Sequence, residues 1–243
     1  MKAKGTVQDF TITSEKLHES IEVLVYLPPN YSSLNKYPYV IAQDGKDYFQ
    51  LGRLARTMDE LLQEKVIQPF IVFGIPYKNV ADRREKYHPQ GSKTKQYIQF
   101  LVQEFIPFIE KNYSLINVAS ARALAGDSLA ATVSLLTAME YPYTIGNVIL
   151  HSPFVDEIVL HKANEFKSWS QLSIYHVIGT EETSVSMTDG NIADFLTPNR
   201  ELQRIISDYP ADYFYDEFVG NHTWKYWQKD LRRAFPYIFP MNK

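Results

Sequence analysis

The residue best placed to do covalent chemistry in this 243-residue chain is Ser128, within the segment Leu124–Ala131 (LAGDSLAA). The apolar residues before it predict a strand, and the residues after it predict a helix. A nucleophile elbow joins a strand to a helix in this way and needs small residues two positions before and after the serine. Gly126 and Ala130 hold those positions. The motif is therefore G-x-S-x-A, which departs from the usual form only at its last residue.

The start of the expected helix would also assist a serine nucleophile. The first N–H groups of a helix have no partner within it and lie at the positive end of its dipole. We therefore expect the backbone N–H of Leu129 to stabilise the oxyanion formed when Ser128 attacks a carbonyl. Alternatively, Ser128 only caps the helix, and the motif alone favours neither reading.

A serine needs a base, and His222 has the best context of the six histidines. It lies in Gly220–Trp224 (GNHTW), between the last expected strand, Tyr213–Val219, and the last expected helix. His151 also follows an expected strand and is the competitor for this role. An imidazole at the end of one strand can take the proton of a serine at the end of another.

The third element is a group of acids after the expected strand Leu172–Ile178. Glu182 follows that strand at the position where the acid of a catalytic triad belongs, with Glu181 and Asp189 as rivals. Most such carboxylates are simply solvated. The order Ser128, Glu182, His222 is nevertheless the order of nucleophile, acid and base in α/β hydrolases.

The elements that must position these residues form an α/β pattern. Two antiparallel strands are expected first, Thr6–Thr13 and Ser20–Leu27. After them, short apolar runs typical of buried strands alternate along the chain with segments of helical periodicity. Alternation of this kind predicts one domain over residues 1–243, with a mostly parallel sheet and helices on both faces. The sites of such sheets lie at the carboxyl ends of the strands. The remaining expected elements are strands 39–42, 70–75, 121–125 and 147–150, helices 51–62, 93–112 (kinked at Pro107), 128–139, 156–166, 196–207 and 223–235, and a long loop over 77–90.

The chain resembles a family of α/β-hydrolase esterases that includes enterochelin esterases, feruloyl esterases, S-formylglutathione hydrolases and mycolyltransferases. Leu27–Tyr31 (LPPNY), Gln43–Phe49 (QDGKDYF), the G-x-S-x-A motif and Gly220–Trp227 (GNHTWKYW) match its motifs in order and spacing. The resemblance runs from about residue 20 to 231 and is strongest to the siderophore-esterase-like branch. It implies an α/β-hydrolase fold and a serine hydrolase without a cofactor, with siderophore-type or aromatic esters as candidate substrates. It leaves open a triad acid or a Ser–His pair alone.

The same resemblance implies further site residues. A backbone N–H of the turn at Gly45 would be the second oxyanion donor, and Tyr48 in the segment that follows is a candidate for substrate binding. Arg83 matches the family's "D-R" segment and would hold an anionic or oxygen-rich substrate. The other interpretation is that Arg83 pairs with acids near it, such as Asp82 and Glu85.

Composition excludes several other classes. The chain has no cysteine, which rules out disulfides, thiolate metal sites and a cysteine nucleophile. A net charge of −3 gives no basic face for nucleic acid, and no apolar run has the length of a signal peptide or a membrane helix. We therefore expect a cytoplasmic serine esterase that acts on a small-molecule ester, with no metal, nucleic-acid or membrane partner. The alternatives are an acyltransferase and a non-catalytic ligand-binding relative.

Overall fold

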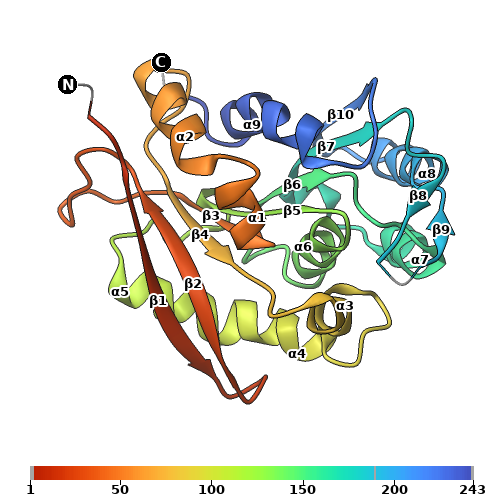
Figure 1. The fold of residues 1–243 in the computed structure, drawn as a ribbon, viewed down its shortest axis with the longest axis horizontal. Coiled ribbons are helices and arrows are strands. Elements are labelled where there is room, and N and C mark those ends of the chain that lie inside the picture. Colours follow the sequence, from red (N-terminus) through yellow and green to blue (C-terminus); the bar gives the residue numbers. More distant parts are fainter. Residues whose placement is uncertain (1–2, 189, 242–243) are drawn as a thin grey trace.

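The computed structural model describes residues 3–188 and 190–241, which form an eight-stranded sheet between two layers of helices (Figure 1). The strands lie in the order β1-β2-β4-β3-β5-β6-β7-β10. The pairs β1–β2 and β2–β4 are antiparallel and all the others are parallel. The strands of this sheet are β1 (Thr6–Ser14), β2 (Glu19–Leu27), β3 (Tyr39–Gln43), β4 (Ile71–Ile75), β5 (Arg122–Asp127), β6 (Asn147–His151), β7 (Ser173–Gly179) and β10 (Asp212–Phe218). The α/β-hydrolase fold predicted from the sequence, with its antiparallel N-terminal strands, is confirmed.

The central strands are mostly apolar because helices cover both of their faces. Every residue of β3, β4 and β6 is buried, as expected for parallel strands within a doubly covered sheet. One layer packs α2 and α9 against the sheet, and the other packs the helices from α4 to α8. The helices are α1 (Gly45–Gln50), α2 (Leu54–Gln63), α3 (Val80–Tyr87), α4 (Thr94–Gln99), α5 (Ile106–Asn112), α6 (Leu129–Glu140), α7 (Glu157–Glu165), α8 (Leu196–Ser207) and α9 (Trp224–Ile238), with short 3₁₀ turns at Ala119–Ala121 and Trp169–Gln171.

Two of the expected helices differ from the observed ones. The expected helix over residues 51–62 is α2 alone, and α1 precedes it directly after the turn at Asp44. The expected helix over residues 93–112 is α4 and α5, joined by a π-helical segment, Phe100–Phe105. That segment widens the helix immediately before Pro107, whose missing N–H leaves one carbonyl of the preceding turn without its helical partner.

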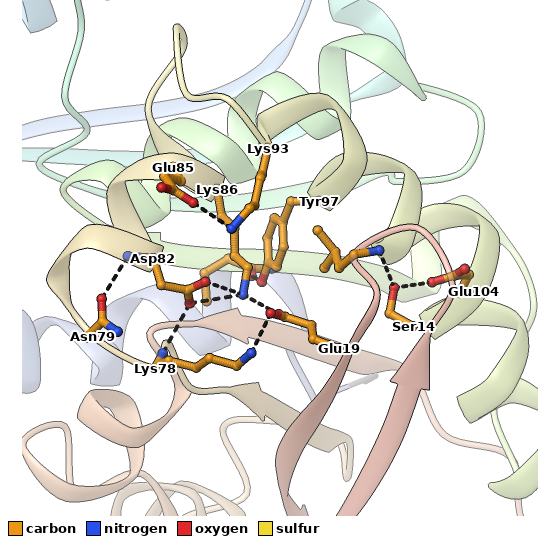
Figure 2. A network of polar contacts seen from close by, with 12 residues as sticks. Ser14, Glu19, Lys78, Asn79, Asp82, Glu85, Lys86, Lys93, Tyr97 and Glu104 are labelled. Atoms are coloured by element: carbon orange, nitrogen blue, oxygen red, sulfur yellow. Dashed lines mark hydrogen bonds and ion pairs between the residues drawn. The ribbon is translucent and has the colours of Figure 1, made fainter.

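The expected loop over residues 77–90 is wrong for most of its length, because α3 occupies it. Asn79 caps this helix by accepting a hydrogen bond from the N–H of Asp82 at 2.9 Å. Lys86 forms ion pairs with Asp82 on the same helix and with Glu19 at the start of β2 (Figure 2). Lys86 and Asp82 are both buried. This charged network fixes α3 against the sheet and so determines where Arg83 lies.

A two-stranded hairpin, β8 (Val185–Ser186) and β9 (Ile192–Ala193), follows β7 and was not expected from the sequence. Its strands are two residues long, too short to show an alternating pattern. In the part of the chain that the structure describes, no helix combines the length and apolar character needed to cross a membrane.

Candidate active site

Ser128 lies at the strained turn between β5 and α6. Its backbone has φ 55° and ψ −128°, a conformation that L residues rarely adopt. A Cβ atom at Gly126 would lie 2.2 Å from the carbonyl carbon of Ala130, so only glycine fits there. The N–H of Ser128 donates to the carbonyl of His151 at 2.9 Å, which ties the turn to the end of β6. This geometry is that of a nucleophile elbow, with the serine presented at the carboxyl edge of the sheet.

His222 and Glu182 meet at the same edge. The Nδ1 atom of His222 lies 2.6 Å from Oε2 of Glu182, whose side chain is completely buried. An imidazole that donates Nδ1–H to a carboxylate keeps its other nitrogen, Nε2, free to accept a proton. Glu182 follows β7 and His222 follows β10, so adjacent parallel strands deliver the two groups.

Ser128 and His222 line one small cavity of about 90 Å³. Its wall also includes Leu129, at the first position of α6, and Arg83 from α3. The rest of the wall is largely apolar and is formed by Phe154, Val185, Ser186, Met187, Thr188 and Phe195. Ser128 and its candidate base therefore face a common space with a largely apolar wall.

Two turns of the backbone lie side by side at the carboxyl edge of the sheet. β3 and β5 are paired with Ala42 opposite Ala125, so the turn at Asp44 adjoins the turn at Asp127. Gly45 begins α1, and a Cβ atom there would lie 2.2 Å from the carbonyl carbon of Gly74 in β4. Glycine is thus required for α1 to approach the sheet. Because the first N–H groups of α1 and α6 both open at this edge, each helix can supply a backbone donor.

Arg83 links these two turns. Its Nη2 lies 2.6 Å from Oδ2 of Asp44, and its Nε donates to the same oxygen at 2.8 Å. Nη2 also donates to the backbone carbonyl of Asp127 at 3.3 Å. Asp82 and Glu85, the partners considered from the sequence, are not the partners in these contacts. The guanidinium borders the cavity while two of its nitrogens hold protein groups.

Two buried acids, Asp44 and Asp127, lie next to one cation, Arg83. Burial raises the pKa of Asp127 well above its ordinary value, and the nearby Asp44 raises it further, while Arg83 opposes both effects. Burial also opposes the charge on Arg83, but Asp44 outweighs this and raises the arginine pKa. Burial raises the pKa of Asp44 as well, but its direct contact with Arg83 opposes this. We therefore expect Asp127 to be the neutral acid of the two and Asp44 to be the ionised partner of Arg83.

The structure does not bring Tyr48 to the cavity, which corrects its expected role in substrate binding. Tyr48 is completely buried, and its ring packs edge-on against Trp224 with centroids 4.8 Å apart. Its hydroxyl lies 3.3 Å from Nδ1 of His151. Tyr48 is a core residue on the buried face of α1.

The rival base is also a core residue. His151 is completely buried, and its Nε2 lies 3.0 Å from Oδ2 of Asp230 in α9. With Tyr48 on its other nitrogen, both nitrogens of His151 are in contact with protein groups. Among the residues that the structure describes, it is not part of the cavity wall at Ser128. This arrangement favours His222 as the base.

Neither rival acid is seen beside His222 in the described residues. Glu181 is exposed, while its neighbour Glu182 points inward to His222. Asp189 lies outside the described residues. Within the described ranges, no group of three or more histidine, aspartate or glutamate side chains could hold a metal ion.

Sequence reasoning missed part of the cavity wall. Phe154 comes from the segment after β6, and Phe195 precedes α8. The sequence signal for Phe154 was its place just after a strand, since the carboxyl ends of parallel strands share one edge. The contribution of the β8–β9 hairpin had no comparable signal.

With this geometry in place, comparisons with known proteins identify the family. The family model described as "Putative esterase" matches residues 14–238, so the chain belongs to that esterase family. The Bacillus subtilis (strain 168) protein YjcH is 49% identical over 224 residues, covering 92% of this chain and 93% of its own.

Two solved structures share the fold. A ferulic acid esterase superposes with a TM-score of 0.81 and 17% identity, covering 98% of both chains. The enterobactin esterase FES from Shigella flexneri, solved in the presence of enterobactin, superposes with a TM-score of 0.83 and 16% identity. That match covers 96% of this chain and 58% of the other.

Replacing Glu182 by glutamine is expected to lower kcat by about two to three orders of magnitude, because an amide no longer fixes the tautomer of His222 or stabilises its cation. The matched control is Glu181→Gln, which makes the same change at the exposed neighbour and should leave kcat unchanged. Steady-state kinetics on one activated ester provides the measurement. Equal effects of the two variants would remove Glu182 from the mechanism.

Replacing Asp127 by asparagine is expected to preserve or raise the free energy of unfolding. A buried acid with a raised pKa destabilises the fold once the unfolded chain ionises it, so this cost is absent below about pH 4 and grows as the pH rises. Urea unfolding of Asp127→Asn and wild type at about pH 4, 6 and 8 should show an advantage of the variant that increases with pH. A deficit that increases with pH would mean that Asp127 is ionised and stabilising in the folded protein.

Proposed function

We propose that this protein is a serine esterase that hydrolyses carboxylic esters through an acyl-enzyme. Ser128 attacks the ester carbonyl while His222 takes its proton, and Glu182 holds His222 in the required tautomer. The alcohol leaves with a proton from His222, and water then releases the acid by the reverse sequence. The observation that carries the proposal is the common cavity of Ser128 and His222, with the buried Glu182 carboxylate 2.6 Å behind the imidazole.

We assign the oxyanion donors to the backbone N–H groups of Leu129 and Gly45. Leu129 begins α6 directly after Ser128, and Gly45 begins α1 in the adjoining turn. Both are helix N-termini, which carry unpaired donors and a positive dipole end. The contacts of Arg83 with Asp44 and Asp127 support this assignment, because they fix the two turns relative to each other.

A panel of substrates tests the proposed activity. p-Nitrophenyl esters of increasing acyl length, a feruloyl ester, a thioester and a trilactone siderophore cover the candidate leaving groups and acyl groups. We expect hydrolysis of at least one ester that Ser128→Ala does not perform. The absence of Ser128-dependent turnover across the panel would favour a non-catalytic ligand-binding relative.

Acyl transfer is the second candidate, because the same fold and acyl-enzyme can deliver the acyl group to an acceptor other than water. The cavity at Ser128 is lined largely by apolar residues, which favours an organic acceptor over bulk water. Hydrolysis measured with and without an added alcohol or amine separates the two activities. Formation of the new ester or amide at the expense of the free acid would identify a transferase.

Arg83 was expected from the sequence to select anionic substrates, but its contacts support a role in holding the two turns together. Arg83→Ala should lower the free energy of unfolding by about 3–5 kcal/mol, because it leaves the buried Asp44 carboxylate without its cation. It should also lower kcat/KM equally on a neutral and on an anionic ester. A much larger loss on the anionic ester would instead make Arg83 a substrate-binding residue.

A further inference from the structure

The two oxygens of the Glu182 carboxylate have different partners. Oε2 faces His222, whereas Oε1 accepts the backbone N–H of Gly179 at 2.9 Å and the hydroxyl of Ser152 at 2.7 Å. Both donors bind Oε1, the oxygen that does not face His222. If the carboxylate rotated, it would lose these two hydrogen bonds. The donors on Oε1 thus determine how accurately Oε2 is aimed at the imidazole.

Ser152 lies at a turn with an unusual backbone conformation. It is completely buried directly after β6 and has φ 48°, in the left-handed region that favours glycine. Its N–H donates to the carbonyl of Val177 in β7 at 2.8 Å, which holds the turn in place. Such strained positions are a reason to look for a function. Here the strained turn directs a hydroxyl at Glu182.

Trp227 determines the direction of that hydroxyl. Its indole Nε1–H donates to Oγ of Ser152 at 3.1 Å, and an indole N–H can only donate. The hydrogen of the Ser152 hydroxyl is thereby left for Glu182. The same indole packs edge-on against the imidazole of His222, with centroids 4.9 Å apart and an interplanar angle of 87°.

We propose, on the basis of the esterase function proposed above, that Ser152 and Trp227 are positioning residues of the active site. Trp227 orients Ser152, Ser152 orients Glu182, and Glu182 orients His222. Neither Ser152 nor Trp227 lies among the described residues that line the cavity at Ser128. Their effect should therefore fall on kcat and leave KM unchanged.

A double-mutant cycle with Ser152→Ala and Trp227→Phe tests the order of action. Ser152→Ala should lower kcat about tenfold with KM unchanged, the scale usual for an outer partner of a reacting group. Trp227→Phe keeps an aromatic ring beside His222 and should lower kcat about threefold. The double variant should match Ser152→Ala alone, because Trp227 acts through Ser152. Losses that multiply, or a change confined to KM, would overturn the proposal.

Matched controls separate positioning from general damage to the fold. Ser134→Ala removes another completely buried serine hydroxyl, and Trp169→Phe changes another buried indole. Both should fold and keep the wild-type kcat. If the Ser152 and Trp227 variants fall in kcat only as far as these controls do, the proposal is wrong.

A measurement that needs no substrate tests the positioning role independently of the proposed esterase activity. The Nδ1–H of His222 is expected to give a downfield proton NMR signal that reports its hydrogen bond to Glu182 and is lost in His222→Ala. Ser152→Ala should shift or broaden this signal, and Ser134→Ala should not. An unchanged signal in Ser152→Ala would contradict the positioning role even in an active enzyme, whereas Ser128-independent ester hydrolysis would contradict only the proposed function.

Discussion

Ser128→Ala is expected to lower kcat by at least about 10³-fold on any ester that the wild-type protein hydrolyses, because the members of a catalytic triad act as a unit. The substitution removes only the hydroxyl from the cavity wall and keeps a Cβ at the strained turn. The free energy of unfolding should therefore change by less than about 1 kcal/mol.

Kinetics and urea unfolding of the same preparation check the two halves of this prediction. Ser134→Ala, in the helix that follows Ser128, is the matched control and should keep the wild-type rate. Near wild-type turnover by Ser128→Ala would exclude Ser128 as the nucleophile. A loss of activity that accompanies unfolding would leave a structural role for the serine and contradict the stability prediction.

His222→Ala should be about as damaging as the serine variant, because without a base the hydroxyl of Ser128 is a weak nucleophile. The imidazole has 16% of its side chain exposed and packs against Trp227 and Phe195, so its removal should leave the fold intact. Steady-state kcat on the ester used for Ser128→Ala measures the loss.

His161→Ala is the control for this variant, since His161 lies on the exposed surface of α7 and should be dispensable. The competing assignment makes a different prediction. If replacing His151 abolished turnover in a folded protein while His222→Ala remained active, the base would be His151.

Much of the fold followed from apolar periodicity alone. Continuous apolar runs such as Phe70–Ile75 predicted β4 within one residue, because a strand covered on both faces has no polar positions. The helix α3 escaped prediction because two of its three buried residues, Asp82 and Lys86, are charged, so it lacks an apolar stripe. Its stability comes from the Asn79 cap and from ion pairs with Glu19 in β2, a residue distant in sequence.

Some residues of the candidate site could be predicted from the sequence, and others could not. Ser128, Glu182 and His222 could be placed because each follows a strand, and parallel strands end at one edge. The partner of Arg83 could not be placed, because Asp44 is 39 residues away and meets it only through the packing of α3. Tyr48 was misplaced because a helix of six residues after Asp44 turns its side chain into the core. Ser152 showed nothing unusual in sequence, since its left-handed backbone and its hydrogen bonds depend on the assembled sheet.

Labelling with a fluorophosphonate, located by mass spectrometry of the digested protein, tests the central claim most directly. The reagent phosphonylates a serine only where a base and an oxyanion site activate it. We predict a single adduct on the peptide that contains Ser128, absent from Ser128→Ala and formed much more slowly in His222→Ala. Ester hydrolysis that persists with Ser128 unlabelled, or an adduct that forms equally well in Ser128→Ala, would contradict the account.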